Sequence, residues 1–134
     1  MILMNKFKKR LTKIIGRPQN AVVVGQGFGQ LASILETFNT VFIFSWDQPS
    51  LKAKNLVFRE NFNDLNPIHD ISAILVDLDQ TQHLETISQL WNKHKCIILI
   101  EGNDPIGRSV SGPLYRDHFR CIDQQGIYHV WKQQ

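Results

Sequence analysis

Three glycines at alternate positions, Gly25, Gly27 and Gly29, are the residues whose spacing most directly indicates chemistry. They follow an apolar run at 21–24, and apolar residues resume after them at helical intervals, so the segment predicts a strand, a tight turn and a helix start. Glycines permit positive φ and let a ligand lie against the main chain, while the free N–H groups of a helix start attract negative charge. Nucleotide-like cofactors are bound in this way, so we expect a cofactor cradle here.

Two aspartates close to the ends of apolar runs are further candidates. Asp47 follows the run at 41–44, and Asp77 follows the run at 73–76. At the carboxyl end of a buried parallel strand, Asp77 would face the crevice in which ligands of open α/β sheets bind. Asp79, in contrast, has the spacing of a helix cap with Gln82, which is a structural role.

Five short apolar runs predict the strands that position these residues: 21–24, 41–44, 56–58, 73–76 and 97–100. Their residues are apolar in succession, which is typical of strands buried on both faces of a parallel sheet. Stripes at helical spacing in 31–38 and 84–91 predict crossover helices, whereas the proline-containing connections at 48–55 and 63–70 predict brief helices or none. We expect an α/β fold with a doubly wound, mostly parallel sheet and helices on both faces.

The last part of the chain predicts an antiparallel hairpin. Strand candidates at 118–123 and 127–132 flank a connection at 124–126. Gly126 stands where the turn requires positive φ. The mostly parallel sheet is therefore expected to end in a C-terminal antiparallel hairpin.

The N-terminal segment is basic and amphipathic, and it predicts a helix over residues 4–15. Six of the fifteen Lys and Arg residues precede the first acid, Glu36, which leaves nine basic against twelve acidic residues in the rest of the chain. The apolar stripe of this helix is expected to pack on the chain's own sheet. Another subunit, an anionic membrane surface or a nucleic acid stays open as an alternative partner of this helix. We expect one domain over 1–134, with this helix in 1–18 and the core in 20–132.

The remaining composition favours a cytoplasmic protein. No apolar run approaches the roughly 20 residues that span a bilayer, and the N-terminus lacks the order of charges of a secretory signal. Cys96 and Cys121 lie in apolar runs and are expected as buried free thiols. The histidines have no ligand spacing, so no metal site is expected.

Together, the glycine pattern, the β/α units and the hairpin resemble the class I S-adenosylmethionine-dependent methyltransferases over about residues 20–132. The resemblance implies a Rossmann-like sheet of seven strands with the last strand inserted antiparallel. It also implies that S-adenosylmethionine is the cofactor. The residues that would hold it are Gly25, Gly27 and Gly29, with Asp47 on the ribose hydroxyls and Asn61 and Phe62 in the segment that contacts adenine.

For methyl transfer, the resemblance implies few catalytic residues. The sulfonium carries a good leaving group, so the protein mainly aligns the acceptor, excludes water and sometimes removes a proton. Asp77 or His83 is the candidate base. Glu101, Asn103 and Asp104, which follow the fifth predicted strand, are candidates for orienting an acceptor that no motif identifies.

Two other functions stay open. A dinucleotide fingerprint, G-x-G-x-x-G, requires glycine where this chain has Gln30, but Asp47 stands at the distance expected of its acid, so a NAD(P)-binding regulatory domain is one alternative. A catalytically inactive methyltransferase-like interaction module is the other. Val23 favours it, because the family commonly has an acid at that position.

Overall fold

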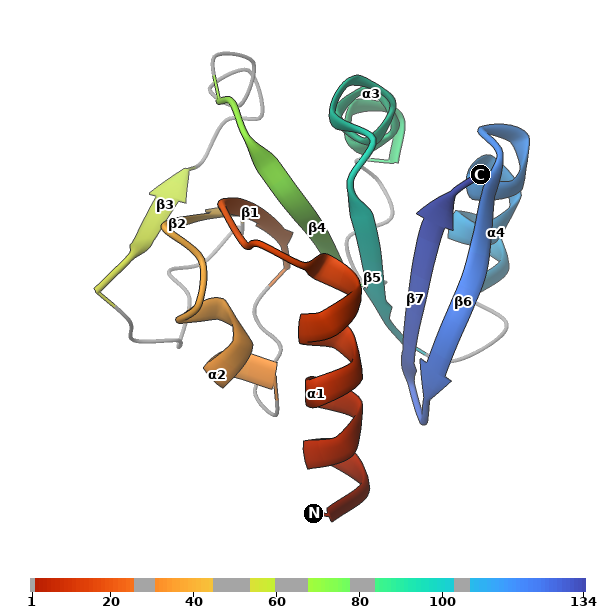
Figure 1. Ribbon diagram of the computed structural model, residues 1–134. Coiled ribbons are helices and arrows are strands. Elements are labelled where there is room, and N and C mark those ends of the chain that lie inside the picture. The colour runs from red at the N-terminus through yellow and green to blue at the C-terminus, as the bar shows by residue number, and fades with distance from the viewer. Residues whose placement is uncertain (1, 26–30, 45–53, 60–67, 78–83, 103–106) are drawn as a thin grey trace.

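Figure 1 shows the computed structural model, which describes residues 2–25, 31–44, 54–59, 68–77, 84–102 and 107–134. The described helices are α1 (Ile2–Ile15), α2 (Ala32–Leu35), α3 (Leu84–His94) and α4 (Gly107–Arg116). The described strands are β1 (Asn20–Val24), β2 (Thr40–Phe44), β3 (Leu56–Arg59), β4 (Ile71–Asp77), β5 (Ile97–Glu101), β6 (Phe119–Gln125) and β7 (Tyr128–Gln133). None of these helices is long and apolar enough to cross a membrane.

The strands form one seven-stranded sheet in the order β3-β2-β1-β4-β5-β7-β6. The first five strands of the chain run parallel, and β7 is antiparallel to both of its neighbours, β5 and β6. This arrangement confirms the predicted α/β fold, with its doubly wound, mostly parallel sheet and its C-terminal antiparallel hairpin.

The two faces of the sheet hold separate cores, which explains the runs of successive apolar residues. On one face, α1 and α2 pack on Ala21, Val23 and Leu75. On the other face, α3 and α4 pack on Val22 and Val24, together with further strand residues (Figure 1). Because side chains of a strand alternate between faces, a strand covered on both sides needs apolar residues at every position.

The N-terminal helix packs inward, as the sequence predicts. Phe7 and Leu11 are almost fully buried in the core between α1 and the sheet. The Phe7 ring stacks on Tyr128 of β7, with 6.0 Å between ring centroids. The apolar stripe of α1 is therefore buried against the chain's own sheet.

The C-terminal hairpin differs in detail from its prediction. Gly126 has the expected positive φ of 58°, but the turn consists of residues 126 and 127, and β6 continues to Gln125. An irregularity between Cys121 and Asp123 inserts an extra residue into β6, which shifts the later pairs of the hairpin. A two-residue turn with glycine first and positive φ at that position alone is typical of type II′.

Helix α4 was not predicted from the sequence. It contains Gly112 and Pro113, both of which lower helix propensity in a helix interior. Leu114 is fully buried in the core on the α3 side of the sheet. Burial of this face in the tertiary structure outweighs the local preferences.

The two cysteines have different environments. Cys96 is buried, as expected, but Cys121 is exposed, so the prediction of two buried thiols was wrong for Cys121. Cys121 lies on β6, the edge strand of the sheet, which has a neighbour on one side alone. An apolar sequence context does not distinguish an edge strand from a central one.

Candidate cofactor site

A topological switch point lies between β1 and β4, at the centre of the sheet. β1 pairs with β2 on one side and with β4 on the other. Helix α2, which follows β1, packs on one face of the sheet, while α3, which follows β4, packs on the opposite face. In open α/β sheets, ligands bind in the crevice outside the carboxyl ends of two such strands.

Gly25 begins the turn that leaves β1 at this point. Its backbone N–H donates a hydrogen bond to the carbonyl of Phe44, at 2.9 Å, so the pairing with β2 continues one residue beyond the strand. Its φ is 125°, a conformation in which a residue with a Cβ is strained. The predicted need for glycine is confirmed at this position.

The register aligns the carboxyl ends of the central strands. Val24 pairs with Phe44 on one side and with Val76 on the other, so Gly25 and Asp77 follow directly on paired residues of adjacent strands. Asp77 is itself paired in register with Glu101 of β5. The structure therefore brings Gly25, Asp77 and Glu101 to one edge of the sheet.

The other predicted site residues lie outside the described part of the chain. These are Gly27, Gly29, Asp47, Asn61, Phe62 and His83, together with Asn103, Asp104 and the predicted cap of Asp79 with Gln82. Their roles stay predictions from the sequence. Within the described residues, no group of three or more His, Cys, Asp or Glu could hold a metal ion.

Tyr128 is a residue at this edge that sequence reasoning missed. It is paired in register with Glu101, and its side chain is buried beneath α1. Burial raises the pKa of the Tyr128 hydroxyl, and the negative charge of Glu101 raises it further. The hydroxyl is therefore a neutral group at physiological pH and can donate a hydrogen bond. In the sequence, Tyr128 is one aromatic residue among several in strand-like runs, so no signal singled it out.

Known proteins resemble this chain in structure and not in sequence. No family model matches the chain, and no curated protein matches it. Solved structures do match. A precorrin-8w decarboxylase from Methanobacterium thermoautotrophicum has a TM-score of 0.62 at 13% identity, over 96% of this chain and 90% of that one.

Two further similar structures are named as methyltransferases. An S-adenosylmethionine-dependent O-methyltransferase from Thermotoga maritima has a TM-score of 0.63 at 11% identity, over 96% of this chain and 64% of that one. A 1,6-didemethyltoxoflavin-N1-methyltransferase from Burkholderia thailandensis, solved with 1,6-didemethyltoxoflavin and S-adenosylhomocysteine, has a TM-score of 0.62 at 16% identity, over 98% of this chain and 79% of that one. The chain therefore shares the α/β fold of these three solved proteins. At these identities the likeness concerns the fold alone, and one of the three proteins is named as a decarboxylase.

Proposed function

We propose that this protein binds S-adenosylmethionine in the crevice between β1 and β4 and transfers its methyl group to an acceptor. The observation that carries the proposal is the backbone of Gly25. This residue has a φ of 125° at the carboxyl end of β1, beside the switch point, and it opens the G-x-G-x-G sequence. One of the similar solved structures was crystallised with S-adenosylhomocysteine, the product of methyl donation.

The proposed roles of the residues come from the family resemblance of the sequence. The main chain at Gly25, Gly27 and Gly29 would lie against the cofactor, since side chains there would block close approach. The Asp47 carboxylate would accept hydrogen bonds from two ribose hydroxyls, because a carboxylate can accept from a diol at both oxygens. Asn61 and Phe62 would lie against the adenine.

Asp77 is the proposed base if the acceptor must lose a proton, and His83 is the second candidate. When bound, the cofactor supplies a methyl group on a positively charged sulfur with a neutral leaving group. The chain then has to orient the acceptor and exclude water. Asp77 ends β4 at the same edge as Gly25, which puts it on the strand adjacent to the proposed cradle.

A thermal-shift comparison tests the cofactor. S-adenosylhomocysteine, NAD and NADP are each added to the protein, since a ligand that binds the folded state alone raises the melting temperature. We expect S-adenosylhomocysteine to raise it by about 10 °C at a concentration near 100 times its Kd, and the dinucleotides to leave it unchanged. A shift with NAD or NADP alone would support the regulatory dinucleotide-binding domain in place of this proposal, although no similar structure reported above supports that alternative.

Two glycine variants locate the binding. Gly27→Val should abolish the shift while the protein still unfolds cooperatively. Gly112→Ala is the matched control, because an added Cβ at Gly112 in α4 meets no atom within 4 Å. This control should retain the full shift. Retention of the shift in Gly27→Val would show that the glycine loop is not the site. No shift with any ligand would favour the inactive interaction module.

The proposal includes the cytoplasmic setting expected from the sequence. Cys121 is a free and exposed thiol. Free exposed thiols persist in reducing compartments.

A further inference from the structure

Helix α1 presents a row of lysines on the side opposite its buried stripe. Lys6, Lys9 and Lys13 are all exposed. Residues three and four positions apart lie on one side of a helix, so these three form a single row. Phe7 and Leu11, on the opposite side, are buried against the sheet. At 1.5 Å per residue, the row is about 10 Å long.

The C-terminal hairpin adds two more cations on the same side of the sheet. Val130 of β7 packs into the core beneath α1. Lys132 lies two residues further along β7, and alternation of side chains places it on the same face as Val130. Arg120 of β6 is the register partner of Lys132, so it shares that face. Both side chains are exposed. We call Lys6, Lys9, Lys13, Arg120 and Lys132 the α1–hairpin surface.

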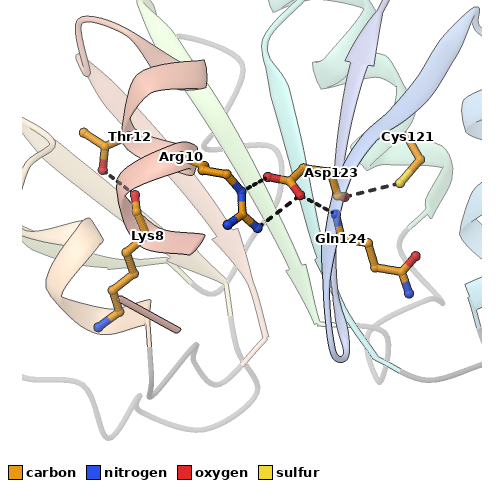
Figure 2. Close-up of polar contacts among 6 residues, drawn as sticks. All are labelled: Lys8, Arg10, Thr12, Cys121, Asp123 and Gln124. Carbon is orange, nitrogen blue, oxygen red and sulfur yellow. Dashed lines mark hydrogen bonds and ion pairs between the residues drawn. The ribbon is translucent and has the colours of Figure 1, made fainter. Parts of the chain in front are cut away.

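Within α1 and the hairpin, acidic residues do not neutralise this surface. Helix α1 contains no Asp or Glu, and Asp123 is the one acid in the sequence of β6 and β7. Asp123 is already bound by Arg10 of α1, with an Nε–Oδ2 distance of 2.9 Å (Figure 2). Glu101 of β5 is paired in register with Tyr128, at the other end of β7 from Lys132. The five cations therefore lie on one side of the sheet and give it excess positive charge, although they come from the two ends of the chain.

We propose that the α1–hairpin surface binds the phosphate backbone of a nucleic acid. A row of lysines about 10 Å long presents several positive charges in a line to the phosphates of one nucleic-acid strand. A membrane is the poorer partner, because a helix that lies on a bilayer inserts an apolar face, and that face of α1 is buried within the protein. Contacts from lysine and arginine to phosphate do not distinguish one base from another. We therefore expect the binding of nucleic acid to depend on charge and not on base sequence.

Fluorescence anisotropy with a short labelled RNA single strand tests the inference on the full chain. If all five cations contact phosphates, the logarithm of the binding constant falls with the logarithm of salt concentration with a slope near −3.5. Two test variants, Lys9→Glu/Lys13→Glu and Arg120→Glu/Lys132→Glu, should each weaken binding at low salt by about 10-fold or more and make the slope shallower by about 1 to 2.

A matched control distinguishes the effect of the α1–hairpin surface on RNA binding from the effect of the protein's net charge. Lys54→Glu/Lys93→Glu changes the charge by the same amount at two exposed lysines, one before β3 and one on α3. This control should weaken binding by less than about 3-fold. An equal loss in the control and test variants would overturn the inference, and so would the absence of RNA binding at low salt. Binding of phosphatidylserine vesicles in preference to RNA would also overturn it.

The inference does not rest on the proposed cofactor. All the substituted side chains are exposed and lie outside both cores, so the variants should still fold and unfold cooperatively. They should also keep any shift produced by S-adenosylhomocysteine. Loss of RNA binding with an unchanged cofactor response is the expected pattern, and failure of the cofactor proposal would leave the RNA result unaffected.

Discussion

Arg10 and Asp123, 113 residues apart in the sequence, form a two-point ion pair between α1 and β6. Arg10 Nε lies 2.9 Å from Asp123 Oδ2, and Nη2 lies 3.3 Å from Oδ1 (Figure 2). The backbone N–H of Gln124 also donates to Oδ1, at 2.8 Å. Because Arg10 is almost half exposed, water screens the pair, and its main effect is to orient α1 against the hairpin.

Replacement of Arg10 should be visible in the titration of Asp123. The hydrogen bond from Arg10 is the main cause that holds the pKa of Asp123 below its usual value. Arg10→Gln should therefore raise this pKa toward the usual value. The measurement is an NMR pH titration of the Asp123 side-chain carboxyl carbon.

Asp117 is the internal control for that titration. Its pKa is lowered first by the hydrogen bond from Trp91, then by Asn92 and Arg116, whereas the pKa of Asp123 is lowered by Arg10 and Gln124. The pKa of Asp117 should not change in Arg10→Gln. Since the folded-state pKa of Asp123 is lowered, the stabilisation from the pair is present above the unfolded pKa and is lost as pH falls through the folded value. Equal shifts at both carboxyls would contradict the pairing.

Trp91 and Trp131 should differ in their response to replacement by phenylalanine. Trp91 is fully buried, and its Nε1 donates to Asp117 Oδ2 at 2.8 Å. Trp91→Phe leaves that carboxylate with fewer donors, so we expect the free energy of unfolding to fall by about 1 to 3 kcal/mol beyond the loss of packing. Urea denaturation measures the change.

Trp131→Phe is the comparison for Trp91→Phe. Trp131 is also buried, but its Nε1 has no hydrogen-bond partner within the described part of the chain. Each tryptophan packs against another aromatic ring, Trp91 on Phe119 and Trp131 on Tyr115. The Trp131 variant should therefore lose less stability than the Trp91 variant. The reverse order would show that the Trp91–Asp117 hydrogen bond contributes little.

His94 should make the protein less stable in mild acid. Burial lowers its pKa below 6.5, and the positive charge of Lys93 lowers it further, with a smaller effect from His69, while Asp70 acts in the opposite direction. Lys95 and Lys132 line the same cavity. The unfolded chain therefore binds a proton more readily than the folded chain, and the free energy of unfolding should fall as pH drops below about 6.5.

Denaturation at a series of pH values, with His94→Gln as the comparison, checks this expectation. The variant has no imidazole to protonate, so its free energy of unfolding should depend less on pH between about 7 and 5. A parent protein that gains stability over this interval would contradict the structure around His94.

The two cysteines should react at very different rates. Cys121 is exposed, whereas burial of Cys96 raises its pKa to about 12. Iodoacetamide should alkylate Cys121 alone in the folded protein and both residues after denaturation, because the thiolate is the nucleophile. Burial also raises the pKa of Cys121, so its alkylation should accelerate in alkaline solution. Peptide mass spectrometry identifies the labelled residue, and a Cys121→Ser variant should take up no label while folded.

The strands were predictable because their signal is local. Residues 21–24 are apolar in succession, and in the structure alternate members of this run, such as Val22 and Val23, enter opposite cores. The conformations of Gly25 and Gly126 were predictable for a similar reason, since glycine beside a strand end or in a short turn adopts positive φ at the least cost.

Features that depend on distant neighbours were not predictable. Leu114 stabilises a helix that Gly112 and Pro113 disfavour, and the reason is its burial against the sheet. The exposure of Cys121 follows from the position of β6 at the edge of the sheet. At the candidate site, the structure shows the positive φ of Gly25 and a register that aligns this residue with Asp77. Gly27, Gly29, Asp47, Asn61, Phe62 and His83 stay predictions from the sequence.

By itself, the sequence determined the class of fold, the glycine turn at the end of the first strand and the closing hairpin, because these depend on residue type and short-range spacing. Tertiary structure alone decided which residues lie together at the carboxyl edge and how the basic helix and the hairpin combine into one charged surface. Such groupings join residues that are far apart in the chain, and they form when the two cores are buried on the two faces of the sheet.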